Sequence, residues 1–475
     1  MRRSAFVRDG LAALSAAAIP TLSSRASAAD VVDYVLTAAP MQFSAAPGVN
    51  ASSLAYNGTL PGPVLRVMHG QRVRVRYHNR TAEPTTVHWH GMILPNAMDG
   101  VAGVTQPAVP PGGSFVYEFV PAPAGTRWYH DHAPGLAVMR GLFGMFVVED
   151  PRDERADAEF AIVLHDIPRP SSIEAAMRGV SDAPMVDPLG SPELKEMRPN
   201  DRMGDEVAYV AHCINGACYP KTAPLRVNVG QRVRLRILNA NQTQTRYVRL
   251  AGHRLHVTHS DGNRLPRPLD VDALRIGVAE RYDAWFEVRK AGSWLLQGLS
   301  SDPLVYEQAV VVHTPGMENA TPEASTETLE GVDFLTYEKA GGVMHGRSVN
   351  TAATVSKYYV LSGGEYASSR WSMNHKIWPN TEKIHVRHGD EVVVRFKNTT
   401  DMDHPMHLHG HVFDVVEIDG RALRFPLPKD VSLVRAYGGT VTWRFRADSP
   451  PGRWLLHCHN QIHMMDGMMT EVVYG

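Results

Sequence analysis

The chain has little cysteine, little net charge and no long hydrophobic run. Three cysteines in 475 residues cannot build a disulfide scaffold. The 48 Lys and Arg nearly balance the 49 Asp and Glu, so no excess of charge selects nucleic acid or an anionic membrane as a partner. The apolar stretch from Leu11 to Leu22, interrupted by Ser15 and Pro20, is too short to span a bilayer. We therefore expect a globular protein with no nucleic-acid partner and no membrane span.

Glycine, proline and histidine are plentiful instead. With 39 Gly, 33 Pro and only 20% charged residues, the composition favours a β-rich protein over a helical bundle. The 23 histidines indicate imidazole chemistry.

Residues 1–28 have the features of an export signal. Arg2 and Arg3 precede the apolar stretch, and Ala26-Ser27-Ala28 supplies a small-x-small cleavage site. The arginine pair resembles that of a twin-arginine signal, which carries folded proteins, although Phe6 lies one position later than in the usual pattern. An ordinary secretory signal with a chance arginine pair is the alternative. Both predict an exported protein, either periplasmic or secreted.

Three copies of one pattern organise the rest of the chain. In residues 64–79, 225–239 and 384–398, two alternating apolar and polar segments flank a glycine and end in asparagine. Short alternating segments separated by Gly and Pro are typical of antiparallel β-sandwiches or barrels. We predict an all-β protein of three tandem β-domains, at 29–150, 151–318 and 319–475. The repeated glycines are Gly70, Gly230 and Gly389, which are 160 and 159 residues apart.

Four His-x-His pairs indicate a metal site. In a β-strand, residues i and i+2 point to the same face, so each pair presents two imidazoles in one direction. Imidazole binds copper, zinc, iron or nickel, so the pairs alone do not select a metal. The pairs are His88 and His90, His130 and His132, His407 and His409, and His457 and His459.

The third repeat adds a thiol to these histidines. Cys458 lies between the two histidines of the last pair, so on a strand its side chain points to the opposite face. His404, His463 and Met468 are further potential ligands in this repeat. Two histidines, one thiolate and a weak thioether form the ligand set of a blue-copper electron-transfer site. One strand then serves two sites and gives electrons a short covalent path between them.

Alignment on the glycines shows which repeats carry ligands. In the first and third repeats a His-x-His pair begins 18 residues after the glycine, whereas the middle repeat has Val248 and Leu250 there. At the end of the first repeat, Asp131 takes the place that Cys458 has in the third. We predict that the middle unit carries no metal ligand and acts as a spacer, and that the third alone builds a thiolate site.

With these motifs, the chain resembles the three-domain multicopper oxidases of the laccase family. The motifs are HWHG (88–91), HDH (130–132), HPMHLHGH (404–411) and HCHNQIHMMDGMM (457–469). The resemblance implies three cupredoxin-like Greek-key domains and four copper ions, of which one is type 1, one type 2 and two type 3. It implies these ligands: His404, Cys458, His463 and axial Met468 for type 1; His88 and His407 for type 2; His90, His130 and His459 for one type 3 ion; and His132, His409 and His457 for the other.

The resemblance also implies a laccase-type activity. Phenols or aromatic amines lose one electron at a time at the type 1 copper, Cys458 relays the electrons, and O2 is reduced to water by four electrons at the trinuclear cluster. Asp99 matches the family's acid that supplies protons there, although Asp-Gly is also a turn pair. Many bacterial relatives have Glu directly after the last type 1 histidine; here that position is Met464. This departure argues against a second proton relay.

Two further functions stay open. Met402, Met406, Met464 and Met465 are close in sequence to type 1 ligands and could hold a soft cuprous ion. The reductant would then be a reduced metal ion, Cu(I), Fe(II) or Mn(II), in place of a small aromatic molecule. A copper-free periplasmic scaffold protein on the same fold is the third hypothesis, and the complete ligand set argues against it.

The other two cysteines flank a turn signal. Cys213 and Cys218 enclose Asn215-Gly216, which predicts a two-residue hairpin turn. The turn places the cysteines opposite each other with α-carbons about 4.5 Å apart, within disulfide reach. A disulfide and two buried thiols both remain open. The polar stretch 171–205 is interpreted as an insertion of unknown purpose.

Overall fold

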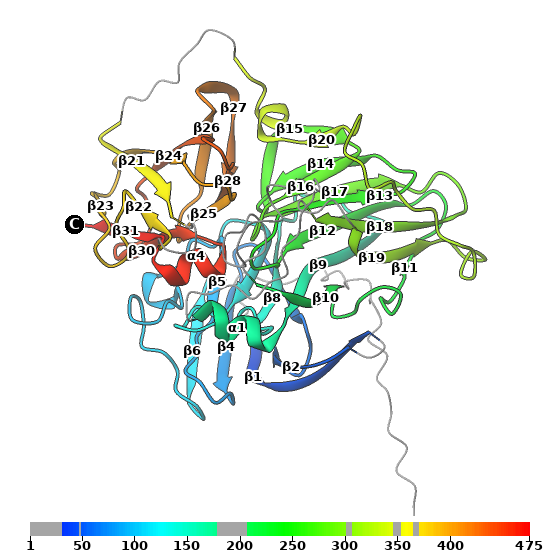
Figure 1. The fold of residues 1–475 in the computed structure, drawn as a ribbon, viewed down its shortest axis with the longest axis horizontal. Coiled ribbons are helices and arrows are strands. Elements are labelled where there is room, and N and C mark those ends of the chain that lie inside the picture. Colours follow the sequence, from blue (N-terminus) through cyan, green and yellow to red (C-terminus); the bar gives the residue numbers. More distant parts are fainter. Residues whose placement is uncertain (1–30, 47–48, 178–206, 301–305, 345–352, 364–369) are drawn as a thin grey trace, which may run out of the picture.

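The computed structural model describes residues 31–46, 49–177, 207–300, 306–344, 353–363 and 370–475. In this part of the chain, six β-sheets form three domains that follow one another along the sequence (Figure 1). The prediction of an all-β protein with three cupredoxin-like domains is confirmed. The predicted export signal and most of the 171–205 stretch lie outside the described residues. No helix within those residues is long and apolar enough to cross a membrane.

The first domain consists of two four-stranded sheets, with the orders β2-β1-β4-β6 and β3-β8-β7-β5. In β4 (Arg72–Asn79), Val73, Val75 and Tyr77 are buried and the arginines between them face outward, as alternation requires. The other elements are β1 (Val31–Ala46), β2 (Val49–Tyr56), β3 (Gly62–Met68), β5 (His88–His90), η1 (Asn96–Met98), β6 (Ser114–Phe119), β7 (Gly125–His130) and β8 (Phe143–Glu149).

The middle domain has two six-stranded sheets, with the orders β10-β9-β12-β17-β14-β15 and β11-β19-β18-β13-β16-β20. Val248 and Leu250, at the positions of the missing histidines, are buried core residues on β13. Its elements are β9 (Ala158–Pro168), α1 (Pro170–Met177), β10 (Tyr209–Ile214), β11 (Leu225–Arg226), β12 (Arg232–Asn239), β13 (Arg246–Leu250), β14 (Leu255–Ser260), β15 (Asn263–Val271), β16 (Ala273–Ile276), β17 (Arg281–Glu287), β18 (Ser293–Ser300), β19 (Tyr306–His313) and β20 (Phe334–Leu335).

The third domain has a six-stranded sheet, β22-β21-β24-β29-β26-β27, and a five-stranded sheet, β23-β31-β30-β25-β28. The second of these carries every predicted ligand of this domain that lies on a strand. The elements are α3 (Tyr337–Gly341), β21 (Val355–Ser362), β22 (Ser372–Met373), β23 (Ile384–Val386), β24 (Glu391–Asn398), β25 (His404–Leu408), β26 (Phe413–Ile418), β27 (Arg421–Lys429), β28 (Val431–Val434), β29 (Thr440–Arg446), β30 (Arg453–Cys458), α4 (Gln461–Asp466) and β31 (Met469–Tyr474).

The three repeats have the same local geometry. Gly70, Gly230 and Gly389 adopt φ values of 88°, 89° and 93°, in the left-handed region that favours glycine. Each is the last residue of the turn that leads into β4, β12 or β24. The conserved spacing of these glycines in the sequence therefore reflects one repeated turn.

One pairing differs from the antiparallel sandwich that we predict from the repeats. In each domain the first long strand runs parallel to the strand after the repeat glycine: β1 with β4, β9 with β12, and β21 with β24. The repeated pattern begins after this first strand, so its direction is not encoded in the alternation that the sequence shows.

The hairpin at Asn215-Gly216 forms as predicted and carries a disulfide. Asn215 and Gly216 have φ values of 51° and 86°, as a two-residue turn of this kind requires. Cys213 and Cys218 are bonded, with α-carbons 4.3 Å apart. The Cys218 N–H donates to the Ala45 carbonyl oxygen at 3.1 Å. The closed hairpin thus fastens the middle domain to the first.

Candidate metal centre

Eight histidines meet at the border between the first and third domains, where β5 approaches β30 and α4 (Figure 1). The rings of His88 and His409 stack with centroids 3.9 Å apart, and those of His90 and His407 stack at 3.7 Å. The structure therefore brings all four His-x-His pairs into one buried cluster, which consists of His88, His90, His130, His132, His407, His409, His457 and His459.

The backbone fixes the orientation of several of these rings. In four of them, Nδ1 lies 2.7 to 2.9 Å from a carbonyl oxygen. A carbonyl oxygen only accepts, so Nδ1 carries the proton and Nε2 keeps its lone pair. These rings and their acceptors are His88 with Asp99, His130 with Asp131, His407 with Asp430, and His457 with Cys458.

The remaining nitrogens point at one another. Nε2 of His409 and Nε2 of His457 are 3.0 Å apart, although the Nδ1–H of each ring is used elsewhere. Two lone pairs at this distance repel each other unless a cation lies close to both. Within the described ranges, the buried Nε2 atoms of His88, His130 and His407 also have no hydrogen-bond partner. The donor set fits metal ions.

Burial keeps seven of these eight imidazoles neutral. In these seven rings, loss of solvation is the main cause that lowers the pKa, and neighbouring imidazoles lower it further. The pKa of His457 falls to about 4. Because a proton competes with a metal for the same lone pair, a lowered pKa favours metal binding. The pKa lies well below its ordinary value in His90, His130, His132, His407, His409 and His459.

A second cluster lies inside the third domain and consists of His404, Cys458 and His463. The two Nδ1 atoms are 2.9 Å apart, and Cys458 Sγ lies 3.7 Å from that of His404 and 3.4 Å from that of His463. All three side chains are buried, and burial lowers the pKa of His404 well below its ordinary value. Two imidazole nitrogens and one sulfur suit a soft transition metal such as copper.

Helix α4 places the last ligands of this cluster. The side-chain oxygen of Asn460 caps the helix by accepting the N–H groups of Ile462 and His463. After the helix, the Cys458 N–H donates to the carbonyl oxygen of Met468 at 3.0 Å, and Met468 is fully buried. This brings the backbone of Met468 next to Cys458. Its role as an axial ligand stays a prediction.

Cys458 joins the two clusters. Its Sγ faces His404 and His463, whereas Nε2 of the preceding residue, His457, faces His409 at 3.0 Å and His132 at 3.4 Å. The alternation of a strand produces this arrangement, as the sequence predicts. Only covalent bonds of adjacent residues therefore separate one cluster from the other.

Asp99 connects histidines of two domains. It follows η1 and is fully buried. Its Oδ2 accepts the Nδ1–H of His409 at 2.9 Å, its backbone oxygen accepts the Nδ1–H of His88, and its Oδ1 is 3.3 Å from the same nitrogen of His88. The acid predicted from the sequence thus lies against the eight-histidine cluster.

The sequence motifs assign no role to two buried residues at the cluster, Asp430 and His411. Asp430 Oδ1 lies 3.2 Å from His90 Nε2. His411 lies behind His409: its Nδ1–H donates to the His409 carbonyl oxygen at 2.8 Å, and its Nε2 is 2.7 Å from the Tyr474 hydroxyl. The signal for Asp430 is a charged pair, Lys429-Asp430, inside an otherwise apolar stretch of the sequence.

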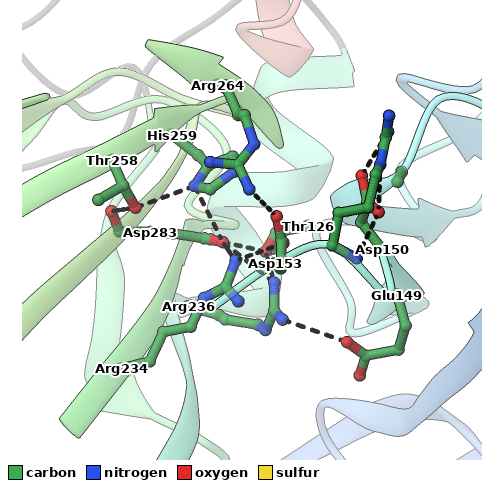
Figure 2. A network of polar contacts seen from close by, with 12 residues as sticks. Thr126, Glu149, Asp150, Asp153, Arg234, Arg236, Thr258, His259, Arg264 and Asp283 are labelled. Carbon is green, nitrogen blue, oxygen red and sulfur yellow. Dashed lines mark hydrogen bonds and ion pairs between the residues drawn. The ribbon is translucent and has the colours of Figure 1, made fainter. Parts of the chain in front are cut away.

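The histidines of the middle domain do not belong to the centre. His256 pairs with Asp270 at 2.8 Å, and His259 lies 2.9 Å from the Thr258 hydroxyl (Figure 2). The His253 Nδ1–H donates to the Ala251 carbonyl oxygen at 2.9 Å. All three rings are hydrogen-bonded within the middle domain.

Sequence comparisons identify relatives over the whole length. Sequence models of the family described as multicopper oxidase match residues 37–153, 193–303 and 350–475. The chain is 32% identical to multicopper oxidase MmcO of Mycobacterium tuberculosis, over 98% of this chain and 92% of that protein. Copper resistance protein A of Pseudomonas syringae pv. tomato is 26% identical over 90% of each. Laccase-4 of Thanatephorus cucumeris is 28% identical over 87% of this chain and 84% of its own.

Solved structures have the same fold. A multi-copper oxidase from Pseudomonas thermotolerans superposes with a TM-score of 0.70 at 28% identity, over 94% of this chain and all of that one. The laccase from Botrytis aclada gives a TM-score of 0.75 at 22% identity, over 97% and 92% of the two chains.

Proposed function

This chain belongs to the multicopper oxidase family, and we propose that it is a laccase-type enzyme with four coppers. Membership of the family makes it an oxidoreductase that binds copper and transfers electrons from a reductant to O2. It oxidises phenols and aromatic amines by one electron each and reduces O2 to water. The type 1 ligands are His404, Cys458, His463 and Met468. Those of type 2 are His88 and His407, and those of type 3 are His90, His130 and His459 for one ion and His132, His409 and His457 for the other.

The position of Cys458 carries this proposal. Its sulfur belongs to one ligand cluster and the two residues that flank it belong to the other. When bound, copper supplies the one-electron redox chemistry at both clusters. The chain itself separates the place where reductant is oxidised from the place where O2 is reduced, and it links the two through the bonds of Cys458 and His457.

The surrounding residues hold the rings and exclude water. Backbone carbonyl oxygens fix Nδ1–H of four rings, so each ring presents a lone pair in one direction. Asp99 holds His409 through Oδ2, and we assign proton supply for water formation to its carboxylate. Burial of every histidine in the cluster keeps bulk water out.

The surroundings of the type 1 cluster support an aromatic reductant. His404 and His463 are fully buried, so an electron must cross another side chain to reach them. The ring of Trp371 lies against that of His463, with centroids 3.9 Å apart and planes tilted by 34°, and Trp371 is itself 5% exposed. Its ring is suited to pass an electron from an organic donor that docks outside.

A metal-ion oxidase is the second candidate. Two curated relatives are named copper resistance protein A, and Met465 on α4 is 38% exposed next to the type 1 cluster. Met406, however, is fully buried opposite Cys458 in the sheet and cannot meet an ion from solution. A soft-metal site here would therefore have fewer methionine ligands than the sequence suggests.

We also propose that the protein is exported to the periplasm or secreted, by a twin-arginine signal at 1–28. The supporting observations are the paired arginines, the short apolar stretch and the cleavage site. Replacing Arg2 and Arg3 by lysine should leave the blue protein in the cytoplasm if this route is used, and secretion of the double variant would contradict it.

Oxygen uptake by the copper-loaded enzyme tests the choice of reductant. A methoxyphenol and Cu(I) are compared at matched concentration and pH. Faster uptake with the phenol, unaffected by added copper, supports the laccase. Faster uptake with Cu(I), or phenol turnover that requires excess copper, would make it a metal oxidase.

A further inference from the structure

Asp430 contacts two predicted copper-ligating histidines that belong to different domains. It lies between β27 and β28 and is fully buried. Its backbone oxygen accepts the Nδ1–H of His407 at 2.7 Å, and its carboxylate oxygen Oδ1 lies 3.2 Å from Nε2 of His90. With Nε2–H of His90 donated to Asp430, the unpartnered Nδ1 of that ring is the nitrogen left for metal.

The carboxylate of Asp430 is held by arginines from the other two domains. Arg281 of the middle domain forms a two-pronged pair with it, Nη1 to Oδ1 at 2.7 Å and Nη2 to Oδ2 at 2.6 Å. Arg127 of the first domain adds Nη1 to Oδ2 at 3.2 Å. All three side chains are fully buried. A fork of this kind fixes both the position and the orientation of a carboxylate.

A turn of the middle domain holds the backbone of the same segment. Asp261, between β14 and β15, accepts the N–H groups of Asp430 and Val431 through Oδ2 at 3.3 and 3.2 Å. Its backbone oxygen accepts from Arg127 at 2.5 Å and from Arg281 at 3.0 Å. The turn is therefore inserted between the first and third domains beside the histidine cluster.

Charge in this assembly is balanced. Lys429 Nζ pairs with Asp261 at 3.0 Å and with Glu280 at 2.9 Å. Three cations and three anions thus share one buried volume: Arg127, Arg281, Lys429, Asp261, Glu280 and Asp430. Removing one partner leaves an uncompensated buried charge, which strongly destabilises the folded protein.

We propose that Asp430 is a positioning residue for the trinuclear cluster and that the middle domain, through Arg281, locks it in place. The unit that has no metal ligand then determines how His90 and His407, from two different domains, face each other. On this proposal, the middle unit has a role beyond that of the spacer predicted from the sequence. The inference rests on the proposed copper-ligand roles of these two histidines.

The test uses full-length, copper-loaded protein with three variants. Asp430→Asn keeps the shape and removes the charge, and Arg281→Lys keeps the charge and removes the fork. Asp283→Asn is the matched control: Asp283 is equally buried and pairs with Arg236 of the same domain at 3.0 Å and with Thr126 of the first domain at 2.6 Å (Figure 2), but it touches no predicted copper ligand.

Three quantities are read for each variant: copper per chain, the blue absorption of the type 1 site, and the type 2 electron paramagnetic resonance signal. We expect about 10- to 100-fold weaker retention of type 2 and type 3 copper against a chelator in Asp430→Asn. Asp430→Asn and Arg281→Lys should both shift the type 2 hyperfine pattern, and in the same direction. Both variants should keep the blue absorption, and Asp283→Asn should keep all three readouts even if its melting temperature falls.

The outcomes distinguish failure of the positioning role of Asp430 from failure of the proposed function. An unchanged type 2 signal and unchanged copper retention in both Asp430→Asn and Arg281→Lys would overturn the positioning role. So would equal losses in these variants and in Asp283→Asn, because the effect would then be general destabilisation. Wild-type protein without blue absorption or a type 2 signal would refute the proposed function itself.

Discussion

Replacing Asp99 by asparagine separates proton supply from the positioning of histidines. The asparagine oxygen can accept the Nδ1–H of His409 as Oδ2 does now at 2.9 Å, and the backbone bond to His88 does not depend on the side chain. The amide NH2 then takes the place of Oδ1, 3.3 Å from the Nδ1–H of His88. Two donors that face each other in a buried site cost about 1–3 kcal/mol, which lowers stability but leaves the ligand set complete.

The amide cannot release a proton, and this is where the rate should change. A positioned acid contributes about 10²–10⁴-fold to a rate that it assists. We therefore expect kcat of Asp99→Asn to fall by about 100-fold or more. Electron transfer from the reductant should stay near its wild-type rate, because Asp99 contacts His88 and His409 and none of its contacts belongs to the cluster of Cys458.

Stopped-flow absorption distinguishes these steps. Anaerobic mixing with reductant bleaches the blue absorption, and mixing with O2 restores it. Asp99→Asn should bleach normally and recover slowly, and it should bind as much copper as the wild type. Recovery at the wild-type rate would refute the proton-supply role. Asp99→Ala lacks both the acid and the acceptor for His409. If Asp99→Asn lost as much copper as Asp99→Ala, Asp99 would act by positioning alone.

Three more predictions follow from the geometry. Cys458→Ser should abolish both the blue absorption and oxygen uptake while the eight-histidine cluster still binds copper; retained oxidase turnover would contradict the link between the clusters. Replacing both Cys213 and Cys218 by serine should cost roughly 2 kcal/mol, because the bridge closes a loop of about six residues, as measured by urea unfolding with kcat unchanged. His457 is kept neutral by burial, with a pKa of about 4 against 6.5 in the unfolded chain. The free energy of unfolding of the copper-free protein should therefore be highest above pH 6.5 and fall as the pH drops towards 4, because the unfolded chain then binds a proton at His457 that the folded chain does not. A urea midpoint that is the same at pH 7 and pH 4.5 would argue against this.

The sequence predicts most of the metal centre because its information is local. A period of two on a strand places His457 and His459 on one side and Cys458 on the other, and the structure has this arrangement. The repeat glycines likewise predict three equivalent turns, since their backbone conformation permits few other residues.

The parts that the sequence leaves unpredicted depend on contacts between distant segments. Arg281 and Asp430 are 149 residues apart in sequence, and neither belongs to a recognisable motif. Their pairing becomes visible only when the middle domain is placed against the third. The parallel direction of β1 and its counterparts is equally non-local, because it depends on how each domain closes.

The split of the eight-histidine cluster between two domains has a consequence for the order of events during biosynthesis. His88, His90, His130 and His132 are made early, whereas His407, His409, His457 and His459 belong to the last part of the chain. A chain that ends before the third domain offers only one or two of the predicted ligands of each type 2 or type 3 ion, and it also lacks Asp430. Each predicted type 2 or type 3 ligand set is therefore complete only once the last part of the chain has been made, whereas His88, His90 and His130 of the first domain already form a group that could hold an ion. A route that exports folded protein would suit such a late maturation.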